Sequence, residues 1–499
     1  MRCCSLFVSI SVQYLISKCE VQGIIELKNN KKMMIKLIQL LLIIVIFITA
    51  NVLAQDKICD RDLTDPSSCS FNGIKVPDEL YKLTPFKDIK FAEVKRIRFS
   101  DSRMYHLPSE VTKTYVNVQD LDISNTHISR FDGMDFSDSN ILIKLNASRN
   151  AIHSLPKGLS NKFRYMQNMD ISNNFIELIE TGAFSYNKNL TYLNLSNNLI
   201  EVIDREFLIA VRSVKILHLS YNRISEIQGD LTDIQFDIEE IYLNDNQLKT
   251  IDPLMIKSLL VLDISRNRLE GHFNFLEAKF IELNVRANFI ETLNVSTILE
   301  KLDASDSNNR MFKINFGTGS WLKELKLSNL DIVDYDHLLN QIKHLANLES
   351  LDLSHNNLES FDFEEVAKSL EVLNLERTNL RKIDNLNYVK ILIPTLKEIN
   401  IQDNLFDCSE LPKILNDFKQ HKINVTGLID GHLNEFVEKN CAPPSHRGDH
   451  QVCQTGSSGA FIFFFVVSIF GNTLCAVVFL LFKYRGFGKN PSQLLMRDF

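Results

Sequence analysis

Residues 193–200 read Leu-Asn-Leu-Ser-Asn-Asn-Leu-Ile, and residues 351–358 read Leu-Asp-Leu-Ser-His-Asn-Asn-Leu. Both stretches complete one pattern, L-x-x-L-x-L-x-x-N-x-L, which holds an asparagine in a fixed slot. The slot recurs fourteen times, filled in chain order by Ser102, Thr126, Asn150, Asn174, Asn198, Asn222, Asn246, Asn267, Asn288, Ser307, Leu330, Asn356, Thr378 and Asn404. The first six steps are 24 residues each, so the chain is built from repeats of one kind.

This spacing is the signature of the leucine-rich repeat, and it predicts an α/β solenoid. Side chains alternate along a strand, so in Leu217-His218-Leu219 the leucines point into a core and the histidine points out. We expect neighbouring strands to pair in parallel and to form the concave sheet of a horseshoe. In such repeats the asparagine side chain bonds backbone groups of the turn, because an unpaired buried peptide group costs about 1–3 kcal/mol.

The asparagine ladder is not complete. Four slots carry a hydroxyl that can partly replace the amide: Ser102, Thr126, Ser307 and Thr378. Leu330 has no polar group, so we expect the ladder to be broken there. Repeat lengths become uneven after Asn246, and the segment 303–331 fits the pattern least well. That segment is either repeat drift or a kink or loop used for contact.

The rest of the chain divides by composition. We assign residues 1–32 to an over-extended start, 33–54 to a signal peptide, 55–91 to an N-terminal cap, 92–406 to about 14 repeats, 407–459 to a C-terminal cap and stalk, 460–482 to a transmembrane helix and 483–499 to a cytoplasmic tail. A stack of repeats needs caps, because its end repeats have no neighbour to bury their apolar faces.

Two apolar runs predict a single-pass type I protein of the plasma membrane, with its repeats outside the cell. Residues 460–482 carry no charge and are long enough to cross a ~30 Å hydrocarbon layer. Lys483 and Arg485 follow and place that end in the cytoplasm. The run Ile35–Ala50 follows basic residues, as in a signal peptide, although a retained N-terminal anchor is the alternative. The seventeen-residue tail is too short for a folded domain, so we expect signalling only through partners.

Cysteines and glycosylation motifs agree with an extracellular location. We expect the caps to be closed by the disulfides Cys59–Cys69 and Cys408–Cys441. Cys453 is left over, so we expect it to be free or to bridge two chains. Five N-x-S/T motifs predict glycans at Asn146, Asn189, Asn194, Asn294 and Asn424.

A candidate ligand-binding patch lies in the slot between the two leucines of each strand. Aspartate is common in this slot, but His218 and Tyr242 depart from it. With Tyr192 and Tyr221 they cluster over three adjacent strands, and tyrosine is enriched at interfaces. Ordinary surface variation is the alternative, and a glycan on Asn194 beside Tyr192 would oppose ligand binding there.

Other classes of function find little support in the sequence. There is no H-E-x-x-H or G-x-S-x-G motif, so we expect neither an enzyme nor a metal site or cofactor. The net charge is −7 without a basic stripe, which does not favour nucleic-acid binding. Arg447-Gly448-Asp449 is the tripeptide of integrin ligands and raises the alternative of an adhesive role.

The region 59–441 resembles extracellular leucine-rich-repeat proteins of insects. The run of 24-residue repeats is similar to the ectodomains of Toll-type receptors, without their intracellular signalling domain. The cap sequence Cys69-Ser70-Phe71-Asn72-Gly73 resembles that of mosquito leucine-rich immune proteins, most of all their transmembrane subclass. The resemblance implies a receptor or co-receptor for extracellular protein or microbial ligands in innate immunity, acting alone or as a homo- or heterodimer. The alternative is a cell-adhesion molecule similar to connectin and chaoptin.

Overall fold

The computed structural model describes a repeat region with its two ends. The described residues are 60–61, 64–76, 93–108, 111, 114–131, 141–228, 237–251, 259–307, 313–317, 319–330, 335–428 and 432–442. They all belong to one compact unit, Met1–Ala442. The predicted signal peptide, membrane span and tail lie outside these residues, as do Cys59, Cys453 and the tripeptide 447–449. Within the described ranges, no helix combines the length and the apolar character needed to span a bilayer.

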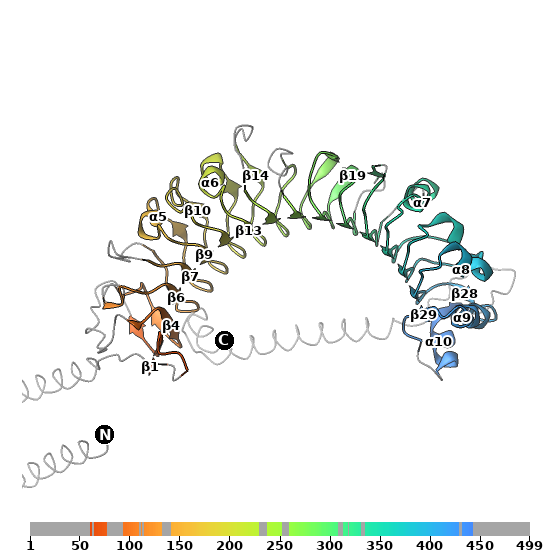
Figure 1. The fold of residues 1–499 in the computed structure, drawn as a ribbon, viewed down its shortest axis with the longest axis horizontal. Helices are drawn as coiled ribbons and strands as arrows, with labels where there is room; N and C mark the ends of the chain where they lie inside the picture. Colours follow the sequence, from red (N-terminus) through yellow and green to blue (C-terminus); the bar gives the residue numbers. More distant parts are fainter. Residues whose placement is uncertain are drawn as a thin grey trace, which may run out of the picture. The chain divides into compact units, whose positions relative to one another are not determined.

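One long sheet lines the inner side of the arc of repeats (Figure 1). Its strands are β1 (Asp60–Arg61), β2 (Ser68–Asn72), β4 (Arg96–Ser100), β6 (Asp120–Asp122), β7 (Lys144–Asn146), β9 (Asn168–Asp170), β11 (Tyr192–Asn194), β13 (Ile216–His218), β15 (Glu240–Tyr242), β16 (Val261–Asp263), β18 (Glu282–Asn284), β20 (Lys301–Asp303), β22 (Glu324–Lys326), β23 (Ser350–Asp352), β25 (Val372–Asn374), β27 (Glu398–Asn400) and β29 (Asn424–Val425).

Pairing follows chain order from β2 to β29 and is parallel throughout, whereas β1 pairs with β2 antiparallel. In β11 the middle residue, Leu193, is buried while Tyr192 and Asn194 are half-buried. The predicted parallel concave sheet is therefore confirmed. Each strand begins one residue earlier than expected: β13 runs from Ile216 to His218, and Leu219 follows it as a second buried residue.

Short strands and helices cover the convex side. The strands are β3 (Lys75–Val76), β5 (Arg103–Met104), β8 (Ser154–Leu155), β10 (Leu178–Ile179), β12 (Val202–Ile203), β14 (Glu226–Ile227), β17 (Glu270–Phe275), β19 (Phe289–Val295), β21 (Lys313–Phe316), β24 (Ser360–Asp362), β26 (Lys382–Asp384), β28 (Phe406–Asp407) and β30 (Cys441–Ala442). The helices are α5 (Leu159–Lys162), α6 (Arg205–Ala210), α7 (Tyr335–Lys343), η3 (Phe363–Glu365), η4 (Leu386–Tyr388), α8 (Val389–Leu392), α9 (Leu411–Gln420) and α10 (Leu433–Asn440).

Repeat length decides what lies on the convex side. The strands of the parallel sheet β17–β19–β21 lie in the steps of 21, 19 and 23 residues that begin at Asn267, Asn288 and Ser307, whereas the 26-residue step from Leu330 to Asn356 contains α7. A strand spans ~3.3 Å per residue and a helix only ~1.5 Å, so a short repeat crosses the same width as a strand. Part of the irregular segment 303–331 is thus the third strand of this convex sheet.

The asparagine ladder holds the turns of consecutive repeats together. Asn198 donates through Nδ2 to the carbonyls of Ile171 and Leu195, at 3.1 and 3.0 Å. Its Oδ1 accepts from the amide of Ile176 in the preceding repeat at 3.1 Å. The same arrangement recurs at Asn150, Asn174, Asn222, Asn246, Asn267, Asn288, Asn356 and Asn404.

The slots in which another residue takes the place of asparagine differ in their hydrogen bonding. The hydroxyls of Ser102, Thr126 and Thr378 each donate to a backbone carbonyl of their own turn, at 2.7–2.8 Å. The expectation was wrong for Ser307, whose buried Oγ has no hydrogen-bond partner among the described residues. The buried side chain of Leu330 lies in the next slot, so the ladder is interrupted over two consecutive repeats.

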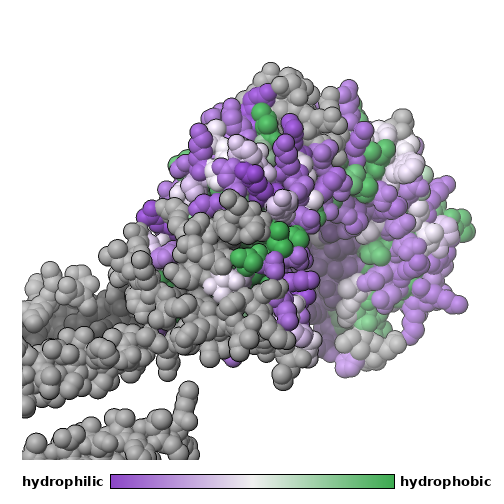
Figure 2. Space-filling view, turned by 60° about the vertical axis from the view of Figure 1, so that its left-hand side comes forward, coloured by the Kyte–Doolittle hydropathy of each residue, from purple (hydrophilic) through white to green (hydrophobic). Residues whose placement is uncertain are grey.

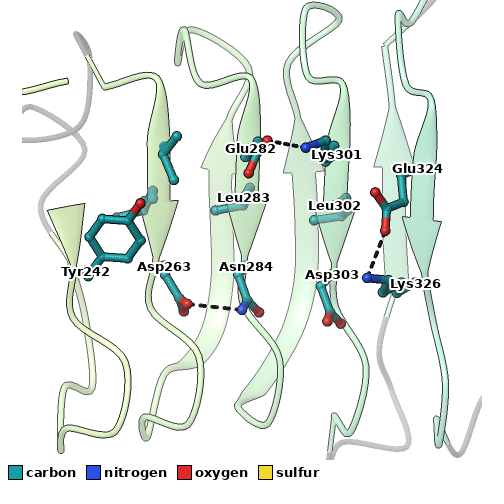
Figure 3. A pocket seen from close by; sticks show the side chains of 12 residues that line it. Tyr242, Asp263, Glu282, Leu283, Asn284, Lys301, Leu302, Asp303, Glu324 and Lys326 are labelled. Carbon is teal, nitrogen blue, oxygen red and sulfur yellow. Dashed lines mark hydrogen bonds and ion pairs between the residues drawn. The ribbon is translucent and has the colours of Figure 1, made fainter. Parts of the chain in front are cut away.

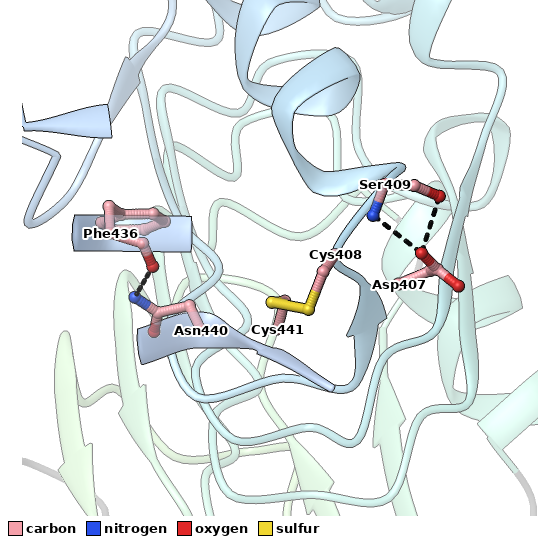
Figure 4. Close-up of a disulfide and its surroundings, with 6 residues drawn as sticks. All are labelled: Asp407, Cys408, Ser409, Phe436, Asn440 and Cys441. Atoms are coloured by element: carbon pink, nitrogen blue, oxygen red, sulfur yellow. Dashed lines mark hydrogen bonds between the residues drawn. A yellow bond between two sulfur atoms is a disulfide. The ribbon is translucent and has the colours of Figure 1, made fainter. Parts of the chain in front are cut away.

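Helix α9 lies between β28 and the last inner strand, β29, and α10 follows that strand. Figure 4 shows the disulfide at this end of the repeats. A disulfide with an S–S distance of 2.01 Å joins Cys408 to Cys441, beside the β28–β30 pair. At the other end Cys69 is buried and disulfide-bonded. Apolar side chains from both ends continue the core of the repeats, as Phe71 and Phe418 illustrate.

Candidate ligand-binding site on the concave sheet

The third residue of each inner strand, here called the outward slot, points away from the core and normally has a structural task. Its side-chain Oδ1 accepts a hydrogen bond from the amide two residues later, at 2.9–3.1 Å, and so caps the turn. Ten residues do this: Asp122, Asn146, Asp170, Asn194, Asp263, Asn284, Asp303, Asp352, Asn374 and Asn400. The frequent aspartate in this slot is therefore explained by the turn.

His218 and Tyr242 occupy the outward slot on adjacent strands and make no such cap. Their side chains form a row with Tyr192 of β11. The rings of Tyr192 and His218 have centroids 5.4 Å apart, and those of His218 and Tyr242 lie 4.6 Å apart at an interplanar angle of 11°. The aromatic row, defined as these three residues, lies on the concave face; rings take the place of turn caps at His218 and Tyr242, whereas Asn194 keeps the cap of β11.

The surroundings of the aromatic row shift the pKa values of His218 and Tyr242. Burial lowers the pKa of His218, against the opposing effect of Glu240 and Asp170. Burial also raises the pKa of Tyr242 to about 12, and so does the hydrogen bond that its hydroxyl donates to Glu240 Oε2 at 2.9 Å. Both groups are therefore neutral near pH 7, and an uncharged aromatic surface faces the concavity.

Tyr221, the fourth residue of the predicted patch, does not lie in the row. It follows β13 in the turn before Asn222, with φ 55°, and half of its surface is exposed. Asn173 and Asn197 hold the same position in the two preceding repeats, with φ 54° and 55°. The structure thus brings together Tyr192, His218 and Tyr242, and places Tyr221 at the edge of the sheet.

A hollow of about 340 Å³ adjoins the aromatic row (Figure 3). Tyr242 forms its wall at β15, and its floor is the buried leucines of the strands beyond. It is lined by Tyr242, Val261, Leu262, Asp263, Glu282, Leu283, Asn284, Lys301, Leu302, Asp303, Glu324 and Lys326. These residues come from the consecutive strands β15, β16, β18, β20 and β22, so the parallel register aligns their side chains in rows across the sheet.

Charged side chains in the hollow are partly paired with each other. Glu282 and Lys301 form an ion pair across β18 and β20, and Lys326 Nζ lies 2.8 Å from Glu324 Oε1. The hydrogen bond to Glu324 raises the pKa of Lys326, as do Glu324, Asp303 and Asp352 nearby. The lining holds four carboxylates and two ammonium groups, so its formal charge is −2.

Sequence reasoning missed most of the hollow. It considered the outward slot, whereas Val261, Glu282, Lys301 and Glu324 are first residues of their strands. Alternation along a strand places the first and third residues on the same face, and this signal could have found them. Among the described residues, no group of three or more histidine, cysteine, aspartate or glutamate side chains could hold a metal ion.

The predicted glycosylation sites fall on different surfaces. Asn146 and Asn194 lie on the concave face, and each Oδ1 also accepts from the hydroxyl of the following Ser148 or Ser196 at 2.7 Å. Asn189 and Asn424 are exposed. Asn294 lies on the convex strand β19, where Oδ1 accepts from Asn315 Nδ2 at 2.7 Å.

Models of the leucine-rich repeat match residues 164–235 and 347–368. No curated protein sequence matches the chain. The structure is similar to the leucine-rich-repeat domain of APL1, at 22% identity over 78% of this chain and 99% of that chain, with a TM-score of 0.56.

Two complexes show the same architecture. The LRIM1/APL1C complex matches at 21% identity over 83% of this chain and 75% of that chain, with a TM-score of 0.56. The TLR13–ssRNA13 complex matches at 20% identity over 67% of this chain and 54% of that chain, with a TM-score of 0.53. APL1 and LRIM1 are mosquito immune proteins. Identities at this level show the fold alone. Together with the matched repeat models, the repeat pattern and the asparagine ladder, they show that the chain forms a leucine-rich-repeat solenoid.

Proposed function

We propose that the chain is a recognition receptor or co-receptor at the cell surface, which binds protein or microbial ligands in innate immunity on its concave sheet. The observation that carries this proposal is the loss of turn caps at His218 and Tyr242. A cap contributes about 1 kcal/mol, and ten other strands keep it. Two adjacent strands exchange it for a stacked aromatic surface that borders a hollow on this sheet.

The character of the surface supports protein recognition. Figure 2 shows a face on which hydrophilic residues dominate and hydrophobic residues form small separate groups. Stable recognition of a partner by such a surface depends on a few aromatic anchors among polar neighbours. The aromatic row supplies rigid anchors of this kind, because each ring is held by the next.

The similar structures favour the same class of function. Two of the similar structures are complexes, of LRIM1 with APL1C and of TLR13 with an RNA, so leucine-rich-repeat proteins of this architecture bind partners. The proposed location at the cell surface rests on the apolar run 460–482 and the five glycosylation motifs. Adhesion is the second candidate, but its tripeptide 447–449 lies outside the described residues, so the concave site carries the proposal.

The test compares binding by cells that express the full-length chain or its variants. Wild-type cells should retain at least one labelled preparation of extracellular fluid proteins or microbial surfaces. Replacing Tyr192 and Tyr242 together by alanine should reduce that retention roughly tenfold or more, because both anchors are lost. Tyr221→Asn is the matched control, since asparagine already holds that turn position at 173 and 197.

The variants separate the outcomes. Retention that depends on the aromatic row but not on Tyr221 supports the proposal. Retention that is equal for all variants, or no retention beyond that of untransfected cells, contradicts it. Aggregation of otherwise non-adherent cells, unaffected by the row variants, would favour adhesion instead.

A further inference from the structure

Two carboxylates in the hollow stand apart from its ion pairs. Asp263 on β16 and Asp303 on β20 lie in the outward slot, on either side of Asn284 (Figure 3). Each caps its turn through Oδ1, at 2.9 and 3.0 Å. Asp263 Oδ2 accepts from Asn284 Nδ2 at 3.2 Å. Neither aspartate forms an ion pair within the described part of the chain, because Lys301 pairs with Glu282, and Lys326, which lies near Asp303, pairs with Glu324.

Tyr242 presents one open ring face to these carboxylates. Its strand β15 lies between β13 and β16, and the ring is stacked on His218 on the β13 side. The opposite face therefore turns toward β16 and Asp263, which lie beside it in Figure 3. The hydrogen bond from its hydroxyl to Glu240 holds the ring in place and adds negative charge next to the hollow.

An aromatic ring face beside a carboxylate favours binding of a planar cation. A guanidinium group stacks on an aromatic face and at the same time donates paired hydrogen bonds to a carboxylate in its own plane. An ammonium group lacks the planar surface, and an anion would meet a lining whose formal charge is −2. The apolar floor of Leu262, Leu283 and Leu302 accommodates the methylene stem of a long side chain.

The spacing of the two carboxylates sets a second requirement. They lie two strands apart, which is roughly 10 Å in a sheet. Three residues of a polyproline-II segment cover about 9 Å and bring the side chain back to the same face, whereas side chains three residues apart in a β-strand point to opposite faces. A peptide that crosses the strands can thus offer one cationic group to Asp263 and a second, three residues later, to Asp303.

We propose that the hollow binds a basic segment of a protein ligand, with an arginine stacked on Tyr242 and paired with Asp263, and with a second basic residue, three positions along, paired with Asp303. The inference rests on the proposed function and specifies its ligand. It commits the site to an extended cationic peptide segment, as distinct from a glycan or a nucleic acid.

The test uses the purified full-length chain and fluorescein-labelled blocked hexapeptides, with binding followed by fluorescence polarisation. The probe is Gly-Arg-Gly-Gly-Arg-Gly, and its neutral isostere has citrulline in place of both arginines. The probe should bind, and the citrulline peptide should not. Moving the second arginine next to the first keeps the charge and should weaken binding severalfold.

Asp263→Asn and Asp303→Asn remove the charges without removing the caps, since Asn284 and Asn374 cap the equivalent turns of their own repeats with an amide oxygen. Each should weaken binding of the arginine peptide roughly tenfold, as expected for loss of a charge-assisted hydrogen bond. Asp352→Asn is the matched control, because Asp352 caps its turn in the same way but lies outside the hollow. Asp352→Asn should leave the affinity within about twofold, because solvent screens the charge of Asp352 from a peptide bound in the hollow.

Each contrary result has a distinct meaning. Equal binding of arginine and citrulline peptides, equal effects of all three substitutions, or no binding up to about 1 mM would overturn the inference. Retention of a ligand on cells could depend on Tyr192 and Tyr242 but be unchanged by Asp263→Asn and Asp303→Asn. That result would refute the binding of a cationic segment and leave the proposed function standing. Retention that ignores the aromatic row would refute the proposed function itself.

Discussion

The imidazole of His218 and the phenol ring of Tyr242 lie nearly parallel on adjacent strands, with centroids 4.6 Å apart and an angle of 11° between the planes. Both occupy a slot that most strands use to cap a turn. The pair therefore marks a place where the concave sheet departs from the rule of its own repeats. The consequences of that departure can be measured for stability as well as for binding.

Acidification should destabilise the protein through His218. Burial lowers the pKa of its imidazole in the folded state below the usual 6.5. The unfolded chain then binds the proton more readily, so the stabilisation is present above pH 6.5 and is lost as the pH falls through the folded-state pKa. Urea unfolding between pH 7.5 and pH 5 should show a falling midpoint.

His218→Phe is the control for this titration, because it keeps an aromatic ring between Tyr192 and Tyr242 but cannot bind a proton. The midpoint of the variant should fall less steeply over the same pH range. Parallel slopes for both proteins would show that another group is responsible.

Removal of a ladder asparagine should be costly. Asn198→Ala leaves the amide of Ile176 and the carbonyls of Ile171 and Leu195 without their side-chain partner. Unpaired buried groups cost about 1–3 kcal/mol each, so we expect a loss of about 3 kcal/mol or more in the free energy of unfolding. Chemical denaturation monitored by circular dichroism measures it.

Ser307→Ala is the informative contrast in the same ladder. Its hydroxyl is already buried without a partner, so its removal should be neutral or slightly stabilising. If Ser307→Ala proved as damaging as Asn198→Ala, the interruption of the ladder at this repeat would be disproved.

The disulfide Cys408–Cys441 should stabilise the C-terminal end of the repeats. It closes a loop with a sequence separation of 33 residues, for which loop-closure entropy gives about 3–4 kcal/mol. Replacing both cysteines by serine should lower the melting temperature and should expose α9 and α10 to proteolysis first. Unchanged melting together with unchanged proteolysis would show that this end is held by packing alone.

The repeat pattern predicts the inner sheet well, because leucine spacing reports burial directly. Leu193, Leu217 and Ile241 are fully buried in the middle of their strands, in the register that the asparagine slot defines. The convex side is less predictable. The leucine and asparagine pattern of a repeat does not distinguish a strand such as β19 from a helix such as α7, because the choice follows from the length of the repeat and the width that it must cross.

The candidate site was predictable only in part. His218 and Tyr242 are conspicuous because they break a slot rule, but their stacking depends on the parallel register of β13 and β15. Tyr221 belongs to the same stretch of sequence, yet its positive φ takes it out of the sheet. The hollow depends on pairs such as Glu282–Lys301, whose partners are 19 residues apart and meet only after the repeats are stacked.

A photo-crosslinking amino acid placed at position 242 tests the central claim most directly, namely that the concave aromatic row is where a ligand is recognised. The full-length chain would carry it either there or, for comparison, at Tyr388, an exposed tyrosine of η4. On cells that retain a ligand, we predict crosslinks to that ligand from position 242 and none from position 388. Crosslinks from position 388 alone would contradict the account.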